Sequence, residues 1–207
     1  MTGELTGRPD ADLALKEWGA AVHALLQGRQ SVLLRKGGIH EKRFLLAGSE
    51  FLLYPTVAHS HADATRPEHA DLLPLGAADV ADEAVVVRAS ASVVEAIEVA
   101  RPENIAALEP FHIWTIASVQ ANRIDFRPKR RLTAIVVSVR PLVSPVRLPV
   151  RDEYGGCRSW VDLVEVPGSS RGRPVRPAPE LREVAAQVRG LVGEPTSSRV
   201  AGDQGDQ

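Results

Sequence analysis

The chain has 207 residues, with 44% hydrophobic and 25% charged side chains and a net charge of −1 at pH 7, which is ordinary for a globular protein with one sizeable core. Its single cysteine, Cys157, excludes an internal disulfide. The sequence does not open on a signal-peptide pattern, and no apolar run reaches the length of a membrane span, so we expect a cytoplasmic protein that does not cross a membrane.

The first predicted element is a helix over residues 10–28. Apolar residues recur along it at helical spacing, namely Leu15, Trp18, Val22, Leu25 and Leu26. A strand over residues 30–36 follows, and its apolar centre predicts burial on both faces. Two more strands are expected over residues 44–46 and 51–54, the second of them ended by Pro55.

Residues 58–84 are acidic and rich in alanine, and they predict a long surface excursion. Residues 132–139, LTAIVVSV, are β-branched and nearly uncharged, which predicts the strongest strand of the chain. The other expected elements are strands over residues 85–88, 146–150 and 159–166 and helices over residues 92–100, 103–108, 118–123 and 181–193.

These elements predict one α+β domain over residues 11–166, a small mixed or mainly antiparallel β-barrel or sheet with flanking helices. Residues 167–180 are rich in proline and arginine and predict a linker, followed by a tail helix over residues 181–193. Residues 1–10 and 194–207 have no hydrophobic pattern, so we expect both ends to be disordered.

A basic and glycine-rich group, Arg35-Lys36-Gly37-Gly38, stands at the end of the first expected strand. Two cations beside a turn that glycines adopt easily can present positive charge and backbone N–H groups together, which favours an anion. The spacing is not that of a phosphate-binding P-loop. The other interpretation is a hairpin turn with two solvated bases.

Three histidines, His59, His61 and His69, lie in the acidic segment. A His-x-His pair can bind zinc, but no second close pair of ligands follows it. We therefore interpret the segment as an acidic surface loop and predict no metal site.

Cys157 is the candidate nucleophile, because it lies in a glycine-rich turn beside Arg158 and a nearby cation lowers the pKa of a thiol. Glu41 or His59 would then serve as the acid or base of an enzyme. The alternative is that Cys157 is a small buried hydrophobe, as lone cysteines commonly are.

Charge is uneven along the chain. Residues 59–109 carry ten acidic side chains and three arginines, whereas residues 121–151 carry eight basic side chains and one aspartate. With Phe126, Tyr154 and Trp160 nearby in sequence, the basic segment has the ingredients of nucleic-acid binding, namely cations for phosphates and rings for stacking. The other interpretation is that the two segments are solvated surfaces that pair across the fold, with the rings in the core.

Four strings, taken in order, resemble the bacterial family known as domain of unknown function 1802: LKEWGAAVHALLQGRQSVLLRKGGIHE, FLLYPTVAH, RLTAIVVSVRPL and EYGGCRSWVDL. The resemblance runs over residues 14–166, and the family has no assigned activity. The chain is also similar to the PUA, ASCH and EVE barrels. The similar features are an L-x-x-G-x-x-x-V-x-x-R pattern leading into a strand, a mostly β region after it, and a last strand that contains tryptophan. That similarity implies a fold whose members bind RNA, nucleotides or modified bases.

We therefore expect a binding module for nucleic acid or a nucleotide-like anion, with no cofactor. Arg35 and Lys36 would meet phosphate, while His59, Tyr154 and Trp160 would line the pocket. The alternatives are a hydrolase-like or nuclease-like enzyme using the same face, with Glu41, His59 or Cys157 as catalytic residue, and a protein-interaction scaffold. The sequence predicts no oligomeric state. The full set of expected ligand-binding residues is Arg35, Lys36, Gly37, Gly38, Glu41, Thr56, His59, Tyr154, Cys157, Ser159 and Trp160.

Overall fold

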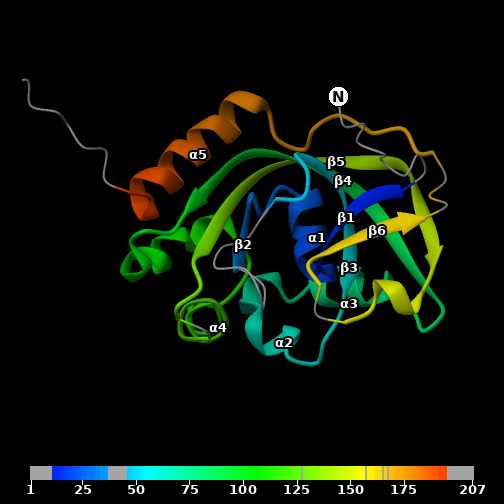
Figure 1. Ribbon diagram of the computed structural model, residues 1–207, viewed down its shortest axis with the longest axis horizontal. Helices are drawn as coiled ribbons and strands as arrows, with labels where there is room; N and C mark the ends of the chain where they lie inside the picture. The colour runs from blue at the N-terminus through cyan, green and yellow to red at the C-terminus, as the bar shows by residue number, and fades with distance from the viewer. Residues whose placement is uncertain are drawn as a thin grey trace, which may run out of the picture.

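Six strands form one mixed sheet in the order β2-β5-β4-β3-β1-β6 (Figure 1). The computed structural model describes residues 11–36, 46–126, 128–156, 158–164, 166 and 168–194. The strands are β1 (Ala11–Trp18), β2 (Val32–Lys36), β3 (Glu50–Thr56), β4 (Ala84–Glu98), β5 (Leu132–Pro149) and β6 (Trp160–Val164). The predicted α+β class with a mixed sheet and flanking helices is confirmed, and the sheet is open rather than closed into a barrel.

Short helices flank this sheet, and one longer helix, α5, lies near the C-terminal end (Figure 1). They are α1 (Gly19–Leu26), α2 (His61–Ala64), η1 (Pro67–His69), α3 (Leu72–Ala78), η2 (Pro102–Phe111), α4 (Ile116–Val119), η3 (Gln120–Asp125), η4 (Asp152–Tyr154) and α5 (Ala178–Val192). Of these, η3 is a π-helix, whereas η1, η2 and η4 are 3-10 helices. No helix within the described ranges is long and apolar enough to cross a membrane.

The single long helix predicted over residues 10–28 is wrong in its first half, because residues Ala11–Trp18 form strand β1 and only Gly19–Leu26 are helical. β1 pairs in parallel with β3 and antiparallel with β6, so its backbone groups are hydrogen-bonded on both sides. Ala14 and Leu15, neighbours on opposite faces, are both fully buried. Pairing on both edges and burial on both faces therefore override the helical spacing of the apolar residues.

The helix predicted over residues 92–100 is also wrong, because β4 continues through it and pairs with β5 along nearly its whole length. β5 in turn extends from Leu132 through three prolines to Pro149. Beyond Val136, β5 no longer pairs with β2 and has β4 as its one strand neighbour. Proline lacks an N–H donor and is accommodated where a strand ladder is irregular. The pairing with β4 is irregular between the pair of Val87 with Val146 and the pair of Ala89 with Pro141, so Pro141 and Pro145 lie at and within this interruption.

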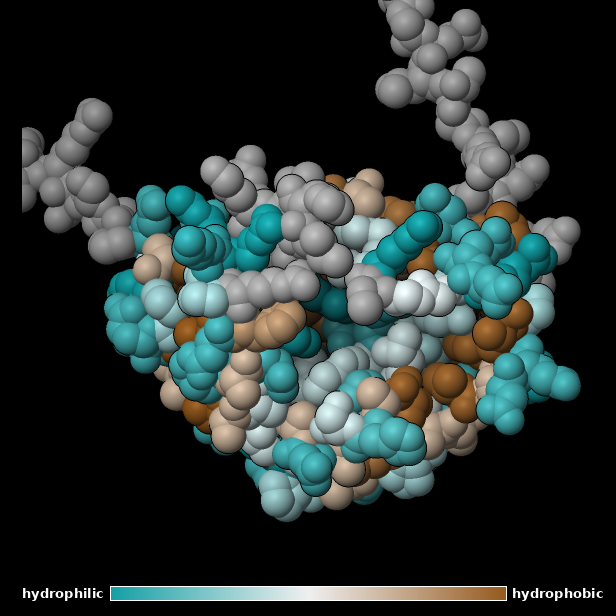
Figure 2. Space-filling view, turned by 60° about the horizontal axis from the view of Figure 1, so that its bottom comes forward, coloured by the Kyte–Doolittle hydropathy of each residue, from teal (hydrophilic) through white to brown (hydrophobic). Residues whose placement is uncertain are grey.

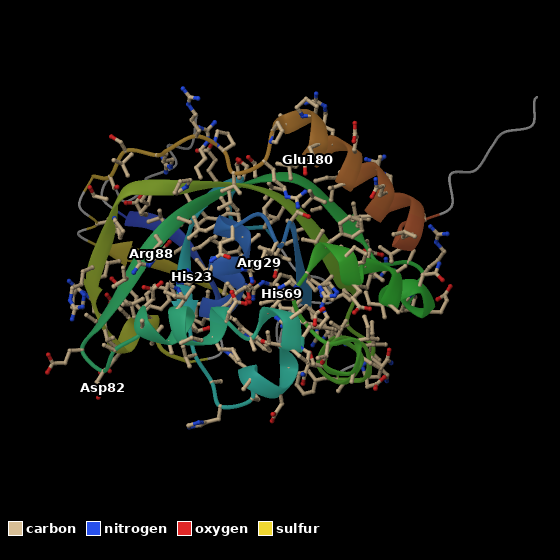
Figure 3. The ribbon with its side chains drawn as sticks, turned by 180° about the vertical axis from the view of Figure 1, so that it is seen from behind. His23, Arg29, His69, Asp82, Arg88 and Glu180 are labelled. Atoms are coloured by element: carbon tan, nitrogen blue, oxygen red, sulfur yellow. The ribbon has the colours of Figure 1, made fainter. Side chains whose placement is uncertain are left out.

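The acidic segment predicted as a surface excursion folds into α2, η1 and α3, and it packs on α1. A Cβ built on Gly76 would lie 2.4 Å from the backbone nitrogen of Ala20, so the two helices approach as closely as glycine permits. Asp79, which follows α3, is buried and accepts hydrogen bonds from His23 on α1 (2.9 Å) and Arg88 on β4 (2.7 Å). Figure 3 shows both of these basic residues from behind.

Other expected elements are adjusted rather than lost. Residues 103–108 belong to the 3-10 helix η2, and the helix expected over residues 118–123 begins earlier, with Thr115 as its N-cap, and passes from α4 into the π-helix η3. Leu46 is not in a strand, and the rest of the strand expected over residues 44–46 lies outside the described residues.

The tail helix α5 contributes to the largest buried cluster, which it shares with β2, η2 and β5. Leu181, Val184 and Val188 of α5 are buried in it. The segment before α5 runs along β5, since the Gly172 amide donates to the Pro141 carbonyl at 2.7 Å and the Val175 amide to the Val139 carbonyl at 2.9 Å. The predicted domain limits stay predictions, but the apolar face of α5 is used inside this fold.

Candidate anion site

The C-terminal end of β1 joins three segments that are far apart in sequence. Arg35 at the end of β2 donates from Nη2 to the Lys16 carbonyl and to Glu17 Oε2 (2.9 Å). Thr56 at the end of β3 donates from Oγ1 to the Glu17 carbonyl at 3.1 Å. Lys16 Nζ donates to the carbonyls of Gly155 (3.0 Å) and Gly156 (3.1 Å) in the turn before β6. Arg35 and Thr56 therefore meet at Glu17, whereas the turn before β6 is held by Lys16, whose side chain leaves the opposite face of β1.

The ion pair at this junction is largely buried. The side chain of Glu17 is 3% exposed and that of Arg35 is 14% exposed. Glu17 Oε1 also accepts the backbone N–H of Trp18 at 2.8 Å, so both carboxylate oxygens are hydrogen-bonded. Arg35 Nε, in contrast, is buried without a hydrogen-bond partner in the part of the chain that the structure describes. The guanidinium therefore has unused donor capacity.

Arg123, on η3, is a second guanidinium in the same electrostatic environment. Burial lowers its pKa, the charge of Arg35 lowers it further, and Glu17 acts in the opposite direction. Within the described residues, its side chain donates only to the neighbouring carbonyl of Asn122, at 3.4 Å, and forms no ion pair. Arg35 pairs directly with Glu17, whereas the half-buried Arg123 is only influenced by the charges of both, so the junction carries an excess of positive charge that an anion would stabilise.

Lys36 fixes the helix that carries Arg123. Its Nζ donates to the carbonyl of Ile124 at 3.1 Å and to that of Phe126, at the C-terminal end of η3 where carbonyls lack helical partners. Burial and then the charge of Arg123 lower the pKa of Lys36, and Asp125 acts against both. π-Helices are rare and are found frequently at functional sites. Lys36, expected as a phosphate ligand, is placed to position Arg123.

An aromatic cluster lies beside Arg123. Trp18 stacks on His61, with ring centroids 3.7 Å apart and planes at 16°, and meets Trp114 edge-on at 6.1 Å. Burial and then the charge of Arg123 lower the pKa of His61 to about 4, so the imidazole is neutral at pH 7. A cavity of about 10 Å³ lies between Trp18, Trp114 and Arg123.

Tyr154 and Trp160, expected to line the pocket, pack in the core. Tyr154 is 3% exposed, its hydroxyl accepts the Val164 N–H at 3.1 Å, and its ring meets that of Tyr54. Trp160 packs edge-on against Phe51, with centroids 5.1 Å apart.

Of the other expected site residues, Ser159 lies next to β1, His59 lies in a separate pocket, and the rest are outside the described residues. The carbonyl of Ser159 accepts the Lys16 amide at 2.9 Å, which fixes the start of β6 to β1. His59 is exposed and, with His61, lines a separate pocket of about 290 Å³ against α1 and α3. Gly37, Gly38, Glu41 and Cys157 lie outside the described residues, and the described residues contain no group of three metal-ligating side chains.

Figure 2 shows the face that comes forward when the α2 and α4 side of Figure 1 is turned to the viewer. This face is hollowed at its centre, and hydrophilic residues gather in the hollow.

Sequence reasoning did not assign Lys16, Glu17, Trp18 or Arg123 to the site. A signal was present, since Lys16, Glu17 and Trp18 lie in the first of the family-like strings and Arg123 lies in the basic segment.

Fold and site define an α+β protein with an open mixed sheet and a buried, cation-rich junction. The chain belongs to the family described as domain of unknown function DUF1802, whose model matches residues 14–187. The resemblance found in the sequence is thereby confirmed. A search of curated proteins finds no match.

Crystal structures of the ASCH protein from Zymomonas mobilis are similar to this chain. The unmutated protein has 12% identity and a TM-score of 0.42, covering 74% of this chain and 87% of that chain. One point mutant has 11% identity and a TM-score of 0.44, covering 85% of this chain and 94% of that chain.

Proposed function

We propose that this chain is a binding module for a nucleotide-like anion or for nucleic acid, with Arg35 and Arg123 as its phosphate ligands. The observation that carries the proposal is that Arg35 Nε is buried without a hydrogen-bond partner among the described residues, while Arg123, whose pKa is affected by the charges of Arg35 and Glu17, forms no ion pair with a described carboxylate. Charge-assisted hydrogen bonds from guanidinium to phosphate are strong and geometrically specific. The aromatic cluster of Trp18, His61 and Trp114 lies beside Arg123 and supplies apolar surface next to the proposed phosphate ligands.

Lys36 and Thr56 hold the site in place rather than bind the ligand. Lys36 secures the end of η3, and Thr56 secures the backbone of Glu17. Of the three candidate catalytic residues, only His59 lies among the described residues, and it makes none of the hydrogen bonds at this junction. The burial of the apolar face of α5 likewise gives no support to a scaffold that uses this helix.

The test is a calorimetric titration of the full chain with UMP, AMP and inorganic phosphate at low and moderate salt. We expect UMP or AMP to bind and Arg123→Ala to weaken the affinity at least tenfold, since one charge-assisted hydrogen bond contributes about 1.5–3 kcal/mol. Arg123 lacks an ion-pair partner among the described residues, so this variant should keep its melting temperature. The matched control is Arg182→Ala, an exposed arginine of α5.

Glu17→Gln separates this proposal from a general loss of structure. The substitution removes the competing negative charge, so a variant that still melts cooperatively should bind the nucleotide as tightly as the unmodified chain or more tightly. The proposal is wrong if neither nucleotide binds at low salt, or if Arg123→Ala and Arg35→Lys leave the affinity unchanged.

A further inference from the structure

A second basic pocket lies next to the candidate site and shares two residues with it. The pocket has a volume of about 510 Å³ and lies between the end of β2, η3, the start of β5 and the end of β4. Its basic side chains are Lys36, Arg123, Arg130 and Arg131, and its acidic ones are Glu98 and Glu194. Arg131 pairs with Glu98, and the surplus of charge is positive. Because Lys36 and Arg123 belong to both regions, cations continue from the buried junction into this pocket.

The pocket is also lined by apolar side chains, which bear on the kind of ligand it could bind. Apolar side chains stand between the cations, among them Val99, Ile124 and Leu132. Phe126, which follows η3 and lies outside the pocket lining itself, is 56% exposed and is the one aromatic among the exposed large hydrophobic residues that the structure describes. Its carbonyl accepts from Lys36, so this ring is fixed to the same helix end that Lys36 secures. Cations beside apolar walls and an exposed ring are the features that bind unpaired nucleotides.

We infer that the ligand is a single strand of several nucleotides, which passes from the Arg35–Arg123 junction over η3 and Phe126 into the second basic pocket. This inference rests on the proposed function and extends it from one phosphate to a run of phosphates. Arg123 meets the backbone at the boundary of the two regions. Phe126 stacks on a base, and Arg130 and Arg131 contact phosphates further along the strand.

The test compares UMP with a fluorescein-labelled uridylate dodecamer, titrated into the full chain at several salt concentrations. We expect the dodecamer to bind at least tenfold more tightly than UMP. Arg130→Gln combined with Arg131→Gln should weaken dodecamer binding and lower the slope of log affinity against log salt by about 1.4, because each phosphate that a side chain neutralises on a single strand contributes about 0.7. Affinity for UMP should not change.

Phe126→Ala should weaken dodecamer binding roughly tenfold without changing the salt slope, because stacking involves no counterion release. Two control variants match these changes away from the pocket. Arg147→Gln combined with Arg182→Gln removes the same charge from exposed positions, and Val143→Ala removes an exposed apolar side chain. Neither control should weaken dodecamer binding more than twofold.

The possible outcomes distinguish the single-strand inference from the proposed binding of a nucleotide. If UMP binds through Arg123 but the dodecamer binds no more tightly, the single-strand inference is overturned and the nucleotide proposal stands. The inference also fails if the pocket variants weaken dodecamer binding no more than their controls do. If neither probe binds at low salt, both proposals fall.

Discussion

Glu17 on β1 and Arg35 on β2 form an ion pair, Oε2 to Nη2 at 2.9 Å, although three strands lie between β1 and β2 in the sheet. The sheet therefore curls far enough for two side chains to bridge strands that share no backbone hydrogen bonds. Because side chains rather than a strand ladder join β1 and β2 here, the pair is structurally important.

We expect Glu17→Leu to lower the free energy of unfolding by about 3–5 kcal/mol, because removing one partner of a buried pair leaves the other charge unpaired. The loss should exceed that of Arg35→Met, since Glu17 neutralises Arg35 directly and also opposes the positive charge around Arg123. The double variant should cost less than the sum of the single changes. Urea unfolding of the four proteins measures this, and a larger loss for Arg35→Met would contradict this role of Glu17.

Two helical glycines should respond in opposite directions to the same substitution. Gly76→Ala places a methyl group against the backbone of Ala20 and Gly19, and we expect a loss of about 2 kcal/mol or more. Gly190 on α5 has no atom within 4 Å of a built Cβ, so Gly190→Ala should stabilise the chain by about 0.5–1 kcal/mol. Thermal melting of both variants is sufficient, and equal shifts would argue against close packing of α1 on α3.

Stability should fall as the pH drops from about 6.5 to about 4. Burial, helped by the charge of Arg123, lowers the pKa of His61 from the ordinary value of 6.5 to about 4. Burial and then the charge of Arg66 lower the pKa of His112 to about 4 as well, while the Trp114 backbone acts in the opposite direction. In this window the unfolded chain binds more protons, so unfolding becomes easier on acidification. Each shift corresponds to at most about 3 kcal/mol.

The measurement is the urea midpoint at pH 7.5 and pH 4.5, compared with His112→Leu. His112 is fully buried, and neither ring nitrogen has a hydrogen-bond partner among the described residues. Replacing it with leucine should be close to neutral at pH 7.5 and should reduce the pH dependence. A pH dependence that is unchanged in His112→Leu would contradict burial of this ring as a cause.

Lys36→Met should loosen η3 without unfolding the sheet. The substitution removes two donors to the C-terminal carbonyls of η3, and we expect faster amide exchange over residues 120–126 than in the unmodified chain. Nucleotide affinity should fall with it, because Arg123 loses its fixed position. Lys129→Met, which removes an exposed lysine nearby, is the control, and equal exchange in both variants would show that Lys36 does not anchor the helix.

The sequence correctly predicted the strands whose own residue pattern is typical of a strand, whichever strands they pair with. LTAIVVSV lies in β5, residues 51–54 in β3, and residues 160–164 in β6, because β-branched or alternating runs have few other uses. It misassigned residues 11–18 and 92–98, where apolar spacing fits a helix as well as a strand. Strand pairing decides these segments, and the partners lie far away in the chain.

Because residues 11–18 fit a helix as well as a strand, the sequence did not predict Glu17 as a site residue. On a helix, Glu17 would have been an ordinary exposed acid, whereas on β1 it is a buried carboxylate that accepts from Arg35. Arg123 gave no local sign of burial, since its environment depends on the π-helix that Lys36 holds from another part of the chain. Arg35 and Thr56 were found because they follow predicted strands, where polar side chains commonly form sites.

The position of β1 between β3 and β6 has a consequence for how the chain is made. Lys16 and its partner Gly155 are 139 positions apart, so a nascent chain completes this edge of the sheet only after most of its length has left the ribosome. Until then β1 presents unpaired backbone groups, as an edge strand does, and is open to intermolecular pairing. We expect refolding to be slow for a protein of this size and truncation before β6 to produce aggregates, since such long-range contacts delay folding.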